Sequence, residues 1–199
     1  MNRDPRPDPG AALMLRFQAG EDAAFEELVR RYQDTVYAFL YRFRGKDEGA
    51  EDLAQEVFLR VFRSRASYRP EAKFSTWLYR ISCNLCINQA RDQREFLSLD
   101  GEPGGEGERA KREWRDLAAE RPLDALESQE LVETIRRTLD QLPENQRAAV
   151  LLYRYHDLSY REIGETIGVS EKAVKSLMAR AREQLKGKLL PYLREEVHG

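Results

Sequence analysis

Apolar side chains recur along this chain every three or four residues, which is the spacing of one buried face of an α-helix. The repeat runs through residues 25–43, 50–62 and 74–85, and it returns over residues 126–142 and 148–155. No segment has the strict alternation of apolar and polar residues that is typical of a half-buried strand. The sequence therefore predicts an all-α protein made of small helical domains.

The helical segments form two groups, separated by a stretch that is poor in apolar residues. Residues 97–122 place glycines among acidic side chains, and such a composition cannot bury enough apolar surface to fold on its own. We therefore expect two helical domains joined by a flexible linker. The expected division is a disordered leader at 1–10, a first domain at 11–95, the linker at 96–122, a second domain at 123–192 and a tail at 193–199.

The overall composition excludes several classes of protein. With 34% charged and 41% hydrophobic residues, the 199-residue chain is typical of soluble, helix-rich proteins. It lacks the run of about 20 apolar residues that a membrane span needs, and its N-terminus lacks the apolar core of a signal peptide. Its two cysteines cannot make a disulfide framework. We expect a cytoplasmic protein with no membrane contact of its own.

Charge is segregated within the first group of helical segments. Residues 47–56 carry five acids and no base, whereas residues 60–94 carry eight bases against two acids. The basic stretch is interleaved with aromatic residues, and cations beside aromatic rings suit a nucleic-acid backbone with unstacked bases. The acidic helix instead suits a cationic protein partner. The first half of the chain is therefore predicted to hold two different binding faces.

The second half contains the pattern of a helix-turn-helix. Ser159 and Glu162 form a capping box that starts a short helix, and Gly168 allows the turn that ends it. Ser170 caps a second helix, and the small residue Gly164 lets the two helices cross closely. The second helix turns small and basic side chains away from its apolar stripe, as a helix that reads the major groove requires. The cap, turn and spacing together favour DNA binding over an ordinary solvated helix face.

Both halves resemble bacterial sigma factors, the dissociable promoter-specificity subunits of RNA polymerase. Residues 52–58 (DLAQEVF) and 74–81 (FSTWLYRI) resemble their promoter-melting domain, and residues 142–176 are similar to their second DNA-binding domain. Two such domains with a short linker match the small extracytoplasmic-function group, also called group 4. The resemblance covers residues 11–95 and 123–190 and implies partners for the chain. These are bacterial core RNA polymerase, promoter DNA as duplex and as melted non-template strand, and an anti-sigma factor that controls initiation.

The resemblance implies three sets of binding residues. Four residues that share one helix face are expected to dock on core polymerase: Asp52, Gln55, Glu56 and Leu59. A proximal set is expected to bind the promoter element near the start site, where DNA is melted: Tyr68, Lys73, Tyr79, Arg80, Asn84 and Arg91. A distal set is expected to read the upstream element as duplex: Ser170, Lys172, Lys175, Ser176, Arg180 and Arg182. Ala173 and Leu177 depart from the residues frequent in the family, so the base preference of this helix is not predicted.

Aromatic residues near the basic helix divide into two kinds. Phe74 and Trp77 lie close to the apolar stripe of their helix, so we expect them in the core. Tyr68 and Tyr79 are the better candidates for DNA contact, because stacking of bases on exposed rings is one way to hold a melted strand. The proximal surface is therefore expected to present these two tyrosines to solvent.

Cys83 and Cys86 are placed by their spacing on an outer face of the third helical segment, with Tyr79 and Ala90. A dithiol switch or half of a metal site is one interpretation of this pair. No second cysteine pair or nearby histidine completes a four-ligand zinc site, so two ordinary small side chains are favoured. We expect them to pack against the N-terminal helix or a partner, with no metal and no cofactor bound.

Two other functional classes stay open from the residues alone. One is a stand-alone helix-turn-helix repressor or activator whose first half is a sensor or dimerisation bundle, and the other is an interaction adaptor without DNA contact. A repressor has no reason to carry the docking residues 52–59 followed by a basic aromatic helix, and an adaptor needs no basic recognition helix. An enzyme is not expected, because the sequence has no nucleophile–base pair or phosphate loop.

Overall fold

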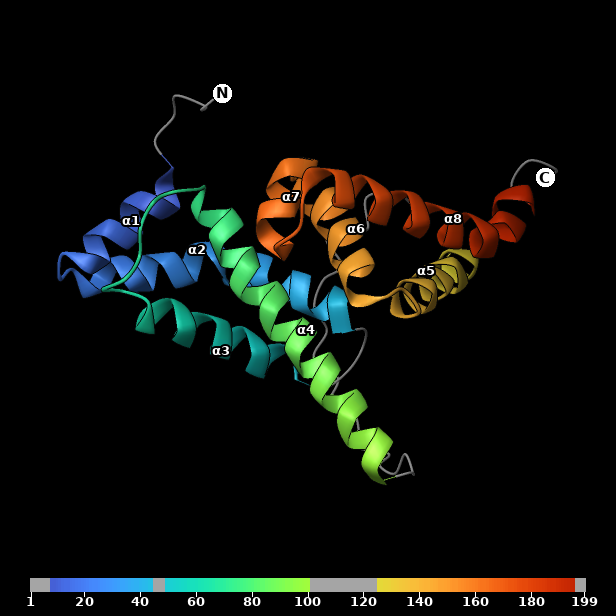
Figure 1. The fold of residues 1–199 in the computed structure, drawn as a ribbon, viewed down its shortest axis with the longest axis horizontal. Coiled ribbons are helices and arrows are strands. Elements are labelled where there is room, and N and C mark those ends of the chain that lie inside the picture. Colours follow the sequence, from blue (N-terminus) through green and yellow to red (C-terminus); the bar gives the residue numbers. More distant parts are fainter. Residues whose placement is uncertain (1–7, 45–48, 101–124, 196–199) are drawn as a thin grey trace.

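The structure is a computed structural model that describes residues 8–44, 49–100 and 125–195. All regular secondary structure in these ranges is helical, which confirms the predicted all-α class (Figure 1). The eight described helices are α1 (Pro9–Gln18), α2 (Asp22–Arg44), α3 (Ala50–Arg63), α4 (Phe74–Asp100), α5 (Ala125–Asp140), α6 (Glu144–His156), α7 (Tyr160–Ile167) and α8 (Glu171–Glu195). Within the described part of the chain, none of these helices is long and apolar enough to cross a membrane.

Helices α1 to α4 form the N-terminal group, whose core is rich in aromatic side chains. Phe17 from α1, Phe39 and Phe43 from α2 and Phe74 from α4 are all almost fully buried. Leu28 from α2 is buried among the same helices. Burial of side chains of this size is worth about 1.5–3 kcal/mol each, so these residues account for much of the stability of the group.

The first helix begins inside the segment expected to be a disordered leader. Pro9 stands at the first position of α1, where its missing N–H costs nothing, and Asp8 caps the helix. The Asp8 carboxylate accepts hydrogen bonds from the backbone N–H of Gly10 at 3.0 Å and of Phe74, the first residue of α4, at 2.6 Å. Gly10 is buried under the Phe74 ring and the Tyr32 hydroxyl, which leave no space for a side chain. The expected leader is therefore wrong for residues 8–10, because Asp8 holds the starts of two helices together.

Helix α4 also extends beyond its expected limit. It continues to Asp100, five residues into the segment predicted as linker. No glycine or proline interrupts it before Gly101, so nothing in the local sequence ends the helix earlier. The remainder of the predicted linker lies outside the described residues.

Helices α5 to α8 form the C-terminal group, and α7 and α8 make the predicted helix-turn-helix. The capping box is present, with the Ser159 hydroxyl accepting from the Glu162 N–H and the Glu162 carboxylate accepting from the Ser159 N–H at 2.9 Å. Gly168 ends α7 in the left-handed region at φ 73°, which glycine adopts without strain. A Cβ at Gly164 would collide with the backbone carbonyl of Val169, so only glycine fits this crossing.

The two groups pack directly against each other. α7 and α6 contact α4, and α6 and α5 contact α2 (Figure 1). Arg147 of α6 joins the groups by donating from Nη1 to the carbonyl of Phe43 at 2.6 Å. The C-terminal end of α4 and the far end of α8 project away from this contact in different directions (Figure 1). The packing of the groups decides which of the predicted binding residues are exposed.

Candidate nucleic-acid interface

The four expected docking residues lie together on one side of α3, here called the α3 face: Asp52, Gln55, Glu56 and Leu59. Asp52, Gln55 and Leu59 are exposed, and Leu59 keeps 49% of its surface in solvent although it is apolar. The carboxylate of Glu56 accepts a hydrogen bond from Arg60 Nε at 2.8 Å, and this bond lowers the pKa of Glu56. Asp52 stands in the first turn, where the helix dipole favours negative charge. The face therefore presents carboxylates beside an exposed leucine.

An apolar groove of about 420 Å³ adjoins this face between α2 and α3. The rings of Phe25, Phe58 and Phe62 line it, together with the exposed Leu59 and Gln55 of the α3 face. Phe62 packs against Phe25 with ring centroids 5.3 Å apart, yet 48% of its surface is exposed. Phe62 is the last residue of the apolar repeat over residues 50–62, and this repeat did not predict the groove. The position of Phe62 at the end of that repeat was the sequence feature that could have indicated the groove.

The residues of the proximal set lie on one side of α4 and on the loop before it. Only some of them are exposed. Lys73, Arg80, Asn84 and Arg91 are exposed, as expected. A pocket of about 490 Å³ opens beside them. It is lined by Ser64, Ser67, Tyr68, Arg69, Glu71, Ala72, Thr76, Trp77, Arg80 and Glu165. The pocket combines aromatic ring edges with hydroxyls and guanidinium groups, a mixture that can hold a polar planar molecule.

The two tyrosines of the proximal set are buried, contrary to the expectation that they face solvent. Tyr68 is only 3% exposed and packs edge-on against Trp77 with centroids 5.0 Å apart. Tyr79 is 4% exposed, and its hydroxyl lies 2.5 Å from Nδ1 of His156 in α6. Burial raises the pKa of Tyr68 to about 12 and that of Tyr79 further still. Tyr79 is covered by Phe39 of α2, with ring centroids 5.7 Å apart, and by His156 of α6, a distant contact that no local pattern could reveal. Phe74 lies in the core as expected, and Trp77 is half-buried.

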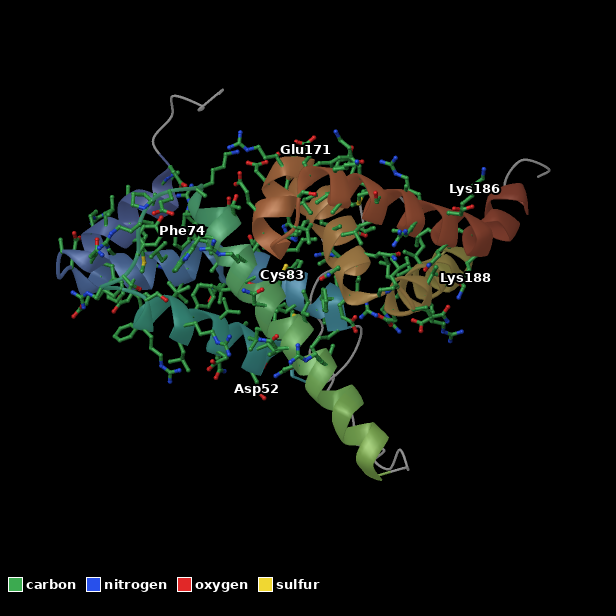
Figure 2. The ribbon with its side chains drawn as sticks, viewed as in Figure 1. Asp52, Phe74, Cys83, Glu171, Lys186 and Lys188 are labelled. Carbon is green, nitrogen blue, oxygen red and sulfur yellow. The ribbon has the colours of Figure 1, made fainter. Side chains whose placement is uncertain are left out.

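The two cysteines do not lie on an outer face. Cys83 and Cys86 are both almost fully buried, and Figure 2 shows Cys83 where α4 meets the C-terminal group. Burial raises the pKa of Cys83 well above its usual value and that of Cys86 to about 12, although Arg44 and Arg147 act in the opposite direction on Cys86. Thiols in such surroundings are protonated and unreactive at neutral pH. The outer-face prediction was wrong because both cysteines are buried, and Cys86 lies near Arg44 of α2 and Arg147 of α6.

The distal set lies at the start of α8 and along its solvent side. Lys172, Lys175 and Ser176 are exposed, whereas Val174 and Met178 on the opposite side are buried. The Ser170 hydroxyl accepts from the backbone N–H of Ala173 at 3.2 Å and so caps the helix. Arg180 is exposed, and Arg182 donates to the Tyr160 hydroxyl at 3.1 Å. The set therefore forms one basic strip on the second helix of the helix-turn-helix.

The chain matches two family models, one in each helical group. Residues 28–96 match Sigma-70 region 2, and residues 133–185 match Sigma-70, region 4. The first match contains α3 and most of α4, so it includes the α3 face and the proximal set. The second contains α6, α7 and the start of α8, so it includes the distal set. The matched segments thus coincide with the surfaces described above.

Full-length relatives are similar along most of the chain. The chain is 37% identical to the ECF RNA polymerase sigma factor SigW of Bacillus subtilis, over 85% of this chain and 91% of that protein. It is 34% identical to the RNA polymerase sigma-H factor of Pseudomonas aeruginosa, over 92% and 95% of the two chains. The ECF RNA polymerase sigma-E factor of Escherichia coli is 32% identical over 92% and 95%.

Two solved structures share the fold. The chain superposes with a TM-score of 0.64 on CnrH in complex with the cytosolic domain of CnrY, over 92% of this chain and 97% of that one. It superposes with a TM-score of 0.65 on the sigma factor RpoE in complex with the anti-sigma factor NepR from Bartonella quintana, over 83% and 96%. Sequence identity is 21% in both cases, so these structures show the common fold of the chains.

Proposed function

We propose which surface of this chain performs each step of promoter recognition. The chain belongs to the extracytoplasmic-function sigma factors of bacterial RNA polymerase. A sigma factor directs core RNA polymerase to specific promoters. The α3 face would dock on core polymerase, the proximal set would bind the melted promoter element, and the distal set would read the upstream element. We propose residues 11–95 and 123–192 as the two functional domains.

The observation that carries this proposal is the separation of two exposed and chemically different faces. Asp52 on α3 and the basic strip on α8 lie on different helical groups and are far apart in the molecule (Figure 2). One complex can therefore use both faces at once, with polymerase on the first and duplex DNA on the second. Tethering of both sites on one chain raises the effective concentration of the second contact, so neither contact alone has to be strong.

The pocket beside the proximal set supports a role in melting. Trp77 and Tyr68 supply ring edges, and Arg69 and Arg80 supply cations at its walls. An unstacked base of the non-template strand fits such a site, because bases bind by stacking and by hydrogen bonds while their phosphates meet the cations. We assign to this pocket one flipped base of the melted element.

Control by an anti-sigma factor is the remaining part of the proposal. The RpoE structure that shares this fold is a complex with an anti-sigma factor. The apolar groove beside the α3 face offers an exposed surface that such a partner could cover in competition with polymerase. The chain would then act in the cytoplasm together with core polymerase, and the chemistry of RNA synthesis would belong to the polymerase alone.

The test is transcription from a pool of genomic promoter fragments by core RNA polymerase with and without this chain. Discrete new transcripts whose templates share two spaced upstream elements are expected. A stand-alone repressor or activator would give no new transcripts and would not co-migrate with core polymerase, and that result would overturn the proposal.

A further inference from the structure

We propose that helix α1 holds the loop between α3 and α4 in the shape that captures a base of the melted promoter element, an inference that rests on the function proposed for the pocket beside that loop. The loop comprises residues 64–73 and supplies most of the residues that line the pocket, Tyr68 and Arg69 among them. α1 precedes residues 28–96, which match the region 2 model, so the match itself says nothing of α1. The contacts of α1 with both ends of the loop make Gln18 and Asp8 positioning residues for promoter melting.

The loop has few buried contacts of its own. Within residues 64–73, all of which the structure describes, Tyr68 is the only buried residue. Exposed segments with so few buried contacts open locally at a low cost in free energy. A loop that becomes ordered only when DNA binds spends part of the binding free energy on its own ordering. Any group that orders the loop beforehand therefore favours the capture of a base.

Gln18, the last residue of α1, holds the start of the loop through its side-chain amide. Its Nε2 donates to the backbone carbonyl of Arg65 at 2.9 Å, and it lies 3.2 Å from the carbonyl of Ala66 and 3.4 Å from that of Tyr68. Carbonyls only accept hydrogen bonds, so the nitrogen end of the amide must face them. α3 ends at Arg63, and carbonyls beyond a helix end have no helical N–H to pair with. One side chain of α1 therefore gathers three carbonyls and fixes the turn that leads to Tyr68.

The side chain of Arg65 strengthens this attachment. Its guanidinium carbon lies 4.4 Å from the centroid of the Phe17 ring, and Phe17 is a fully buried residue of α1. Its Nη1 lies 3.2 Å from the carboxylate of Asp22, the first residue of α2. The start of the loop is thus held by its backbone and by a side chain, both against the C-terminal end of α1.

Asp8 holds the other end of the loop, where α4 begins. Its carboxylate caps α1 and also accepts from the backbone N–H of Phe74 at 2.6 Å. Asp8 and Gln18 are ten residues apart, which corresponds to about 15 Å along a helix. The loop runs beside α1 from the end of α3 to the start of α4 (Figure 1). α1 therefore acts as a splint that fixes both ends of the loop.

Substitutions at Gln18 separate its hydrogen bonds from its packing. Gln18→Met keeps an unbranched side chain of similar length and removes the N–H donors, whereas Gln18→Lys keeps N–H donors on an ammonium. Gln18 is half-buried at the end of α1 and lies outside the hydrophobic core, so both variants should fold. Gln184→Lys, at an exposed site on α8 away from the loop, adds the same charge and is the matched control (Figure 1). Asp8→Ala removes the acceptor at the other end of the loop.

The experiment uses the full chain assembled with core polymerase on a promoter recovered by the transcription test. Promoter opening is followed with the base analogue 2-aminopurine in the proximal element, because its fluorescence rises when it leaves the base stack. Gln18→Met and Asp8→Ala are expected to slow opening by about fivefold or more, since capture scales with the fraction of molecules whose loop is competent. Gln18→Lys and Gln184→Lys should open the promoter at the rate of the unaltered chain. Affinity of each free chain for the duplex upstream element should stay unchanged, and thermal unfolding checks that each variant is folded.

The outcomes separate this inference from the proposed function. If Gln18→Met opens the promoter as fast as the unaltered chain, Gln18 does not position the loop and the inference fails, whatever the result for Asp8→Ala. Opening by Gln18→Lys that is as slow as that by Gln18→Met would show that the N–H donors are not the cause, and would also overturn it. A parallel loss of upstream affinity or of folded protein in Gln18→Met would indicate a general structural defect and count against it equally. If the unaltered chain opens no promoter at all, the proposed function itself is refuted.

Discussion

The hydroxyl of Tyr79 and the imidazole Nδ1 of His156 meet at 2.5 Å across 77 residues of sequence, and this contact ties the sigma region 2 group to the region 4 group. His156 also packs against Phe39 with ring centroids 5.7 Å apart. The imidazole therefore lies in the contact between the two helical groups. Its protonation state bears directly on how firmly the two groups hold together.

Acidification is expected to destabilise the packed state through His156. Burial, reinforced by the positive charge of Arg42 and opposed by Asp157, lowers the pKa of His156 from 6.5 to about 4. A histidine with a depressed pKa stays neutral in the folded state while the unfolded state binds a proton, so its stabilising contribution is full above pH 6.5 and is lost as the pH falls toward 4. At about 1.4 kcal/mol per pH unit, the loss between pH 7.5 and pH 5 is ~2 kcal/mol.

Urea unfolding at these two pH values measures the effect. His156→Gln has no titratable ring, so the variant should lose this part of the pH dependence while carboxylates elsewhere titrate as before. An identical pH dependence in the variant and the unaltered chain would show that His156 contributes nothing to it.

Gly164→Ala is expected to destabilise the helix-turn-helix by about 1–3 kcal/mol, the usual cost of overpacking. Its Cβ would meet the carbonyl oxygen of Val169, which is backbone at the turn and cannot rotate away. Gly187→Ala in α8 is the matched control, because nothing lies within 4 Å of that position. The same substitution there should stabilise the helix by about 0.5–1 kcal/mol. Thermal unfolding of both variants gives the sign of each change, and equal signs would refute the clash.

Charge reversal on the α3 face is expected to weaken docking on core polymerase by about tenfold or more, because like charges across an interface cost several kcal/mol. The variant is Asp52→Lys combined with Glu56→Lys. Glu27→Lys combined with Asp34→Lys on exposed positions of α2 changes the net charge equally and should bind as before. Co-migration with core polymerase in gel filtration reports the result, and circular dichroism confirms that the first group is folded. If the Asp52 and Glu56 variant binds core polymerase as well as the unaltered chain does, the α3 face is not part of the docking site.

Lys175→Ala is expected to weaken binding to the upstream element and to leave polymerase docking intact. Lys175 is exposed on the basic strip, where in the free chain its ammonium lies 2.9 Å from Glu171. Loss of one phosphate contact should reduce the slope of log affinity against log salt by about 1. Lys188→Ala, at an exposed site further along α8, serves as the control. A parallel loss of DNA binding and polymerase docking would indicate misfolding instead.

Local signals predicted the helix-turn-helix closely. The capping box at Ser159, the turn at Gly168 and the cap at Ser170 act over three or four residues, so the sequence contains all that is needed to place α7 and the start of α8. The common side of the four α3 residues was equally predictable, because residues three, four and seven apart on one helix share a side whatever surrounds it. Their docking on core polymerase stays a prediction.

Contacts between distant segments could not be predicted in the same way. Tyr79 packs between Phe39 of α2 and His156 of α6, and Cys86 lies near Arg44 of α2 and Arg147 of α6, so both groups contribute to the burial of this side of α4. The apolar stripe of a helix indicates how that segment packs within its own group. The burial contributed by α6 comes from residues more than 60 positions further along, so the stripe does not predict it. Asp8 is a similar case, since its role depends on the amide of Phe74.

The double cap made by Asp8 limits how the N-terminal end of such a protein can vary in evolution. One side chain satisfies amides at the start of α1 and at the start of α4, the helix on which most of the proximal set stands. A deletion or substitution at this single site would therefore loosen both helix starts together. Homologous chains should keep Asp, Asn, Ser or Thr at the aligned position, or else supply a compensating acceptor from another part of the chain.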